Sequence, residues 1–197
     1  TFTFFRKYNY MSNLNTPKEI AVEFCNTGIN KANTNLLKFI LLAVLGGSFI
    51  AFGGLLSVIV AGGMPEVMAN NSGLVKFVGG AMFPIGLIMV SVAGADLFTS
   101  DCAFMTIPVL QRKLNFGKLL KIWSLSYVFN FVGAAFVAYF MAYKSGLISN
   151  SPWNDYLHNL AGNKVSYDFF TVFIKGIGAN WLVCLGTWMG YAAKDVS

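Results

Sequence analysis

The sequence predicts an all-α integral membrane protein, and composition is the first reason. Of its 197 residues, 56% are hydrophobic and only 11% are charged, whereas an average soluble domain carries roughly 25% charged residues. The second reason is that the apolar residues gather in segments long enough to cross a bilayer, which takes about 20 residues. The third is that polar residues interrupt one of these segments. We therefore expect an amino-terminal segment at 1–35 and a transmembrane domain at 36–197.

The amino-terminal segment contains one predicted helix. The string TPKE at 16–19 places Thr16 at the cap, Pro17 at the first helical position and Glu19 three residues after the cap, which is a capping-box pattern. Apolar and charged residues continue from there to about Asn30. Such a helix lies either on the membrane surface or in solvent, and the pattern does not choose between the two.

Four apolar stretches predict four spanning elements, at about 37–63, 75–111, 118–143 and 168–193. The first has a glycine face suited to close helix packing, formed by Gly46, Gly47, Gly53 and Gly54. A short turn is expected after this first span. A polar loop is expected at 144–167, and it holds the chain's only histidine, His158.

The second spanning element is broken. Two apolar halves are separated by polar residues and one glycine at Gly94, Asp96, Thr99, Ser100 and Asp101. Carboxylates and loose backbone at membrane depth are tolerated where they face protein or a water-lined cavity. Transporters place substrate sites at such discontinuous helices. The alternative is an ordinary loop between two short helices, but the second half is too short to cross a bilayer alone.

Lysines and arginines flank the apolar segments instead of forming one stripe, so we expect the lipid bilayer and not nucleic acid as the partner. They cluster before the first span and at 112–121, and the turn after the first span has none before Lys76. The positive-inside rule therefore predicts a multi-pass protein of the cell membrane, plasma or inner, with a cytoplasmic amino terminus. We expect no cleavable signal peptide, residues 1–10 carry no assignment, and Met11 is a possible start.

The sequence does not favour an enzyme. Its three cysteines, Cys25, Cys102 and Cys184, lie far apart without metal-ligand spacing, so neither a metal nor another cofactor is expected. A membrane enzyme would need a cluster of histidines, cysteines or carboxylates at membrane depth, and Asp96 with Asp101 does not make one.

Two strings, GADLFT in the broken element and NWLVCL in the fourth span, resemble the formate/nitrite transporter family in their order and separation. The resemblance runs from about Thr16 to the end of the chain. It implies an aquaporin-like bundle of six helices, four of them present here, that assembles as a homopentamer with one pore in each protomer. It also places a pore histidine on the fifth helix, for which His158 is no substitute.

The resemblance implies proton-linked transport of small monovalent anions, with formate first and nitrite or hydrosulfide as alternatives. An aquaporin-like channel for neutral solutes is the alternative of another class. That class predicts paired Asn-Pro-Ala strings, which this sequence lacks.

The same resemblance places residues along the pore. Phe83 and Leu87, one helical turn apart, match an apolar constriction toward the outside. Leu97 and Phe98 match an inner slit, and Thr99 matches a pore threonine whose hydroxyl can hydrogen-bond an anion. The plainer alternatives are ordinary helix packing for the apolar residues and a helix cap for Thr99.

Three further positions complete the predicted path. Lys164 matches a vestibule lysine that would concentrate anions, although the sequence alone favours a solvated loop lysine. Asn180 matches an asparagine that adjoins the pore centre, and Val183 matches an apolar pore-lining site.

Four polar residues in or beside the spans receive structural predictions. Asp96 is expected to bond loop amides and hold the break in shape, and Asp101 to cap the second half-helix or alter anion preference. Lys175 is expected to have a structural partner. Asn130 is expected to form an interhelical hydrogen bond.

Overall fold

The computed structural model describes residues 14–194, and this part of the chain is helical, with one isolated bridge between Leu14 and Ala193. The prediction of an all-α membrane protein is confirmed. Within residues 14–194, four helical stretches are long and apolar enough to cross a membrane. Residues 1–10 and the possible start at Met11 lie outside the described residues.

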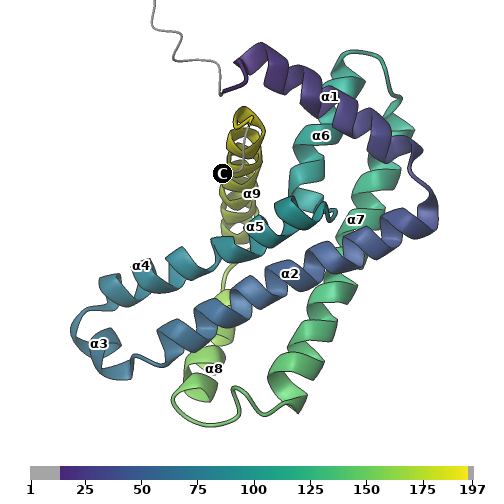
Figure 1. The fold of residues 1–197 in the computed structure, drawn as a ribbon. Helices are drawn as coiled ribbons and strands as arrows, with labels where there is room; N and C mark the ends of the chain where they lie inside the picture. The colour runs from purple at the N-terminus through teal and green to yellow at the C-terminus, as the bar shows by residue number, and fades with distance from the viewer. Residues whose placement is uncertain (1–13, 195–197) are drawn as a thin grey trace, which may run out of the picture.

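The first and second spanning elements pack side by side. The first is α2 (Leu36–Gly62), and the second consists of α4 (Ser72–Met82) and α5 (Pro84–Ala93), which together form one apolar stretch. Figure 1 shows α4 and α5 running alongside α2. A shorter apolar helix, α6 (Phe98–Leu110), follows the break.

The third spanning element is α7 (Phe116–Phe136), which continues as the π-helical stretch η1 (Val137–Lys144). The fourth is α9 (Phe169–Ala192). The apolar surface that these helices expose is what a lipid bilayer or neighbouring helices would cover.

Two connections expected as turn or loop contain helices. A short helix, α3 (Pro65–Asn70), lies in the first turn, and α8 (Trp153–Val165) occupies much of the expected polar loop at 144–167. The indole of Trp153 donates a hydrogen bond of 2.9 Å to the carbonyl oxygen of Ile59 on α2. Tertiary contacts of this kind stabilise a helix even where the local helix propensity is weak. The polar composition of the segment therefore did not reveal its helical backbone.

The amino-terminal helix α1 (Pro17–Asn33) begins with the predicted capping box. The Glu19 amide donates to the Thr16 hydroxyl at 3.3 Å, and a Glu19 carboxylate oxygen accepts from the Thr16 amide at 2.7 Å. The bonds from Thr16 hold the pKa of Glu19 below its ordinary value. The capping box therefore defines the amino-terminal end of α1.

One face of α1 packs on protein. The Phe24 ring lies 4.5 Å from that of Phe104 on α6, and 5.1 and 5.0 Å from those of Trp188 and Tyr191 on α9, measured between centroids. Figure 1 shows α1 lying across the end of the bundle beside α6. The helix therefore joins α6 to α9.

Helix α2 crosses its neighbours at glycines. A Cβ atom built on Gly47 would lie 1.9 Å from the Asn130 carbonyl oxygen on α7, and one on Gly53 would lie 2.6 Å from that of Phe83. Gly54 differs, since its nearest neighbour would be the Phe83 ring at 3.9 Å. The predicted glycine face thus includes close backbone contacts at Gly46, Gly47 and Gly53.

Candidate functional site

The break between α5 and α6 is short and firmly held. Helix α5 ends at Gly94, which has φ +67° in the left-handed region that suits glycine. The Asp96 amide then donates to the Leu42 carbonyl oxygen of α2 at 3.1 Å. Leu97 is extended, and α6 begins at Phe98. The chain therefore leaves one helix and enters the next within four residues.

Asn130 of α7 clamps both sides of the break. Its amide nitrogen donates to the Asp96 carbonyl oxygen at 2.9 Å and to that of Ala43 at 2.6 Å. Its side-chain oxygen accepts from the Phe98 amide at 2.8 Å, which satisfies one of the free amides at the start of α6. The predicted interhelical hydrogen bond of Asn130 is confirmed, and it joins α2, α7 and the break.

Lys31 of α1 reaches the break from the other side. Its Nζ contacts the carboxylate of Asp96 before the start of α6 and lies 2.7 Å from Asp101 Oδ1 in the first turn of α6. The three side chains are 14%, 6% and 0% exposed. The ammonium also lies 5.1 Å from the centroid of the Phe104 ring. A single lysine thus links the two ends of the break to α1.

This arrangement corrects two predictions. The Asp96 carboxylate bonds Lys31, and it is the Asp96 backbone that meets Leu42 and Asn130, so the loop-amide prediction was wrong about the side chain. Asp101 does not cap α6, which has no side-chain cap of its own. An ammonium stabilises a buried carboxylate more than a backbone amide does, because the bond between two charged groups offsets more of the cost of burial.

Thr99 and Asn180 carry buried oxygens without partners. Thr99 Oγ1 and Asn180 Oδ1 are inaccessible to solvent and make no hydrogen bond within the described residues. Thr99 therefore does not cap the second half-helix. The Thr99 carbonyl oxygen accepts from the thiol of Cys184, one helical turn after Asn180, at 3.1 Å. The two oxygens belong to the region where the start of α6 meets α9.

The same contact between α6 and α9 contains a second polar pair. The hydroxyls of Ser100 and Thr187 lie 3.1 Å apart in a buried position. Thr187 Oγ1 also donates to the carbonyl oxygen of Val183, which is half-buried. Val183 therefore lies between the turns of α9 that carry Asn180 and Thr187.

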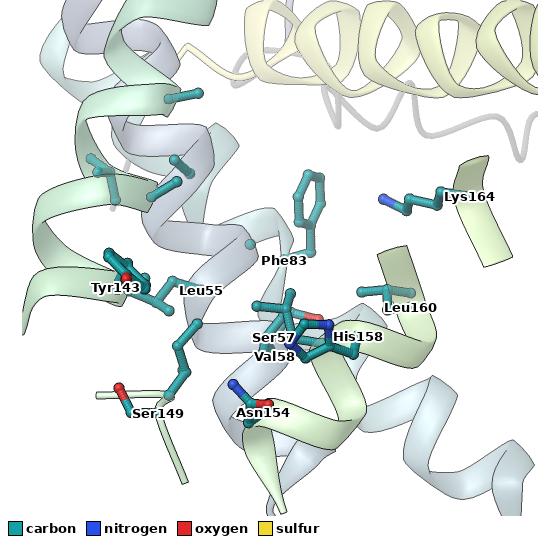
Figure 2. Close-up of a pocket in the computed structure, with 18 residues that line it drawn as sticks. Leu55, Ser57, Val58, Phe83, Tyr143, Ser149, Asn154, His158, Leu160 and Lys164 are labelled. Atoms are coloured by element: carbon teal, nitrogen blue, oxygen red, sulfur yellow. The ribbon is translucent and has the colours of Figure 1, made fainter. Parts of the chain in front are cut away.

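A hollow of about 860 Å³ lies between α2, η1 and α8, and two predicted site residues, Phe83 and Lys164, line it. Figure 2 shows Lys164 of α8 directed toward the ring of Phe83, which lies between α4 and α5. His158 lines the hollow too, as do Ser57 and Val58 of α2. The hollow therefore combines apolar walls with two basic side chains on α8.

The remaining apolar candidates lie apart from this hollow. A Cβ atom on Gly186 of α9 would lie 3.3 Å from Leu87 Cδ2, so Leu87 faces α9. Leu97 is buried, and the Phe98 ring packs edge-on against those of Trp123 and Tyr127 on α7. The structure thus places the outer pair, Phe83 and Lys164, separately from the residues at the break.

Lys175, for which we expected a structural partner, lies 3.2 Å from the centroid of the Tyr167 ring. The ammonium lowers the pKa of the Tyr167 phenol through a hydrogen bond and its charge. This contact ties the start of α9 to the preceding turn.

Sequence reasoning missed Lys31 as a site residue and counted it only among the flanking bases. Its position, seven residues after Phe24, puts it on the same buried face of α1. That spacing was the available signal. Ser100 and Thr187 were missed as a pair because nothing in the sequence brings α6 against α9.

Among residues 14–194 no three histidine, cysteine or carboxylate side chains gather in a way that could hold a metal ion.

Comparison with known proteins identifies the family to which the chain belongs. A sequence profile described as "Formate/nitrite transporter" matches residues 18–197. A "Probable formate transporter" of Methanothermobacter thermautotrophicus is 38% identical over an alignment of 180 positions, and the match covers 84% of this chain and 65% of the relative. The "Formate channel BtFdhC" of Bacillus thuringiensis is 36% identical over 182 residues, which are 91% of this chain and 68% of the relative.

A solved structure described as "FNT family ion channel" matches with a TM-score of 0.77 and 27% identity, over 87% of this chain and 68% of that one. The chain therefore spans about two thirds of the length of these relatives. Its relatives and its fold are those of transporters and channels and not of enzymes.

Proposed function

Because the chain belongs to the formate/nitrite transporter family, we propose that its protein passes small monovalent anions across a membrane, with formate as the first substrate. The names of two relatives, a probable formate transporter and a formate channel, support formate. Nitrite and hydrosulfide have the same charge and similar size, so they are the alternatives within the family.

The observation that carries this proposal is the pair of unpartnered oxygens at the break, Thr99 Oγ1 and Asn180 Oδ1. Buried polar groups in proteins are almost always hydrogen-bonded, so such a pair indicates a missing partner. A hydroxyl can donate to an anion, and the start of α6 adds the positive end of a helix dipole. A small anion passing the break would find a donor in the Thr99 hydroxyl, whereas Asn180 Oδ1 can only accept a hydrogen bond.

The outer end of the path is built for attraction followed by selection. Lys164 gives the hollow a positive charge that raises the local concentration of anions. In this proposal Phe83 and Leu87 form the outer apolar constriction, and Leu97 and Phe98 form the inner slit. An isolated charge is costly to bury among such side chains, and the neutral acid form is not. We therefore propose that transport is linked to protons.

The assembly and placement of the protein belong to the same proposal. Helices α7 and α9 expose large apolar side chains along their length, enough surface for both lipid and neighbouring protomers of a homopentamer. The basic residues that precede α2 and follow α6 support a cytoplasmic amino terminus in a plasma or inner membrane, through the positive-inside rule.

Uptake of labelled formate into proteoliposomes containing the full-length protein tests the site. Replacing Thr99 with alanine should lower the uptake rate about tenfold or more, because a hydrogen bond to a charged group contributes about 1.5–3 kcal/mol. Thr106→Ala is the matched control on the same helix, since the Thr106 hydroxyl bonds the Cys102 carbonyl oxygen at 2.6 Å. Equal rates for the two variants would contradict the role of Thr99.

A further inference from the structure

The cluster of Lys31, Asp96 and Asp101 has more acid than base. Two carboxyl groups share one ammonium, and each of the three side chains is at least 86% buried, since none is more than 14% exposed. Among the described residues, 14–194, no other lysine, arginine or histidine forms an ion pair with either carboxyl. If both carboxyls were ionised, the interior would hold an uncompensated negative charge, which is costly.

The position of the unpartnered atom identifies the carboxyl on which a proton would relieve this cost. Asp101 is fully buried, its Oδ1 accepts from Lys31, and its Oδ2 has no hydrogen-bond partner among the described residues. Asp96 keeps a small exposed fraction, and neither of its carboxylate oxygens is buried without a partner. An ionised oxygen with no donor is the costlier of the two to bury.

The neighbours of Asp101 leave its Oδ2 without a free donor among the described residues. The Ser126 side chain of α7 lies beside the Asp101 carboxyl, and the Ser126 hydroxyl already donates to the Ile122 carbonyl oxygen at 2.9 Å. The nearby indole of Trp123 donates to the backbone oxygen of Asp101. A hydroxyl whose single hydrogen already bonds a carbonyl oxygen has none left to donate to a carboxylate.

The other elements packed against the first turn of α6 add no positive charge to offset the second carboxyl group. Helix α9 faces it with Thr187, whose hydroxyl meets that of Ser100. Cys102, the next residue on α6, lies near Asn180 and supplies no positive charge. Lys31 is therefore the sole cation among the described groups that face Asp101.

We propose that Asp101 holds a proton on Oδ2 at a pH at which exposed carboxyls are ionised. The cluster is then neutral, with Lys31 and Asp96 as its ion pair and Asp101 as a neutral acid whose Oδ1 accepts from Lys31 of α1 and whose backbone oxygen accepts from Trp123 of α7. Asp101 is a positioning residue in this arrangement, because it acts on the break through Lys31 and α7 and not by touching a solute.

Infrared spectroscopy of the full-length protein in lipid tests this directly. At about pH 6 exposed aspartates and glutamates are ionised, since their ordinary pKa values are about 4. The protein should nevertheless show the C=O stretching band of a protonated carboxylic acid, shifted in heavy water. The band should disappear in Asp101→Asn, which keeps the shape of the side chain. It should persist in Glu66→Gln, which removes an exposed carboxyl.

Two results would overturn the proposal: absence of the band from the unaltered protein, or its survival in Asp101→Asn. Loss of the band in Asp96→Asn together with survival in Asp101→Asn would move the proton to Asp96 and equally reject the assignment. The measurement on the unaltered protein needs no variant to fold. It is also independent of the solute, since a failure to transport formate with the band present counts against the proposed function alone.

Discussion

Replacing Lys31 with methionine should lower the free energy of unfolding by about 3–5 kcal/mol, because it removes one partner from a buried ionic cluster. Methionine keeps an unbranched apolar stem but removes the ammonium, which leaves Asp96 and Asp101 without their shared donor. Thermal unfolding of the purified protein in lipid or detergent measures the loss. The expected result is a clearly lower midpoint and weaker attachment of α1 to the break.

Two further variants separate the charge effect from a general loss of lysine. Lys38→Met, at an exposed position in the first turn of α2, should leave the midpoint unchanged. Adding Asp96→Asn and Asp101→Asn to Lys31→Met should recover part of the loss, because no carboxyl group is then left buried without the ammonium. If Lys31→Met and Lys38→Met unfold at the same temperature, the cluster does not hold the break.

Gly47→Ala should destabilise the protein by preventing the close approach of α2 and α7. The added Cβ would lie 1.9 Å from the backbone oxygen of Asn130, the residue that clamps the break, and a backbone atom cannot turn away as a flexible side chain can. Overpacking of this kind costs typically about 1–3 kcal/mol and occasionally more, and we expect the upper end. The yield of monodisperse protein and its unfolding midpoint report the effect.

Gly54→Ala is the matched control, since it makes the same change on the same helix. Its Cβ would meet the Phe83 ring at 3.9 Å, an ordinary contact distance. Alanine also favours a helix over glycine by about 1 kcal/mol, so this variant should be as stable as the parent or more so. Equal damage from both substitutions would mean that α2 does not cross α7 at the predicted glycines.

The sequence predicted the features that follow from local pattern. Apolar length identified the spanning helices, the TPKE string identified the start of α1, and the polar interruption after Gly94 identified the break. Each of these signals lies within one stretch of chain. The helix α8 was missed because its stability depends on contacts with α2, such as that between Trp153 and Ile59.

The charge cluster could not be predicted because it joins residues far apart in the chain. Lys31 and Asp96 are separated by 65 positions, and nothing in either segment names the other as partner. A buried carboxylate at Asp96 needs hydrogen-bond donors, and the amides of the adjoining loop are the nearest donors in the sequence. The pairing required knowing that α1 folds back across the start of α6, which is a property of the packed molecule.

The measurement that tests the central claim most directly compares formate with glycerol as permeants of proteoliposomes containing the full-length protein, with and without an inward proton gradient. We predict that formate enters much faster than into empty liposomes, that the proton gradient increases its rate, and that glycerol enters at the rate of empty liposomes. Glycerol or water crossing rapidly while formate does not would contradict the claim that this protein passes small anions.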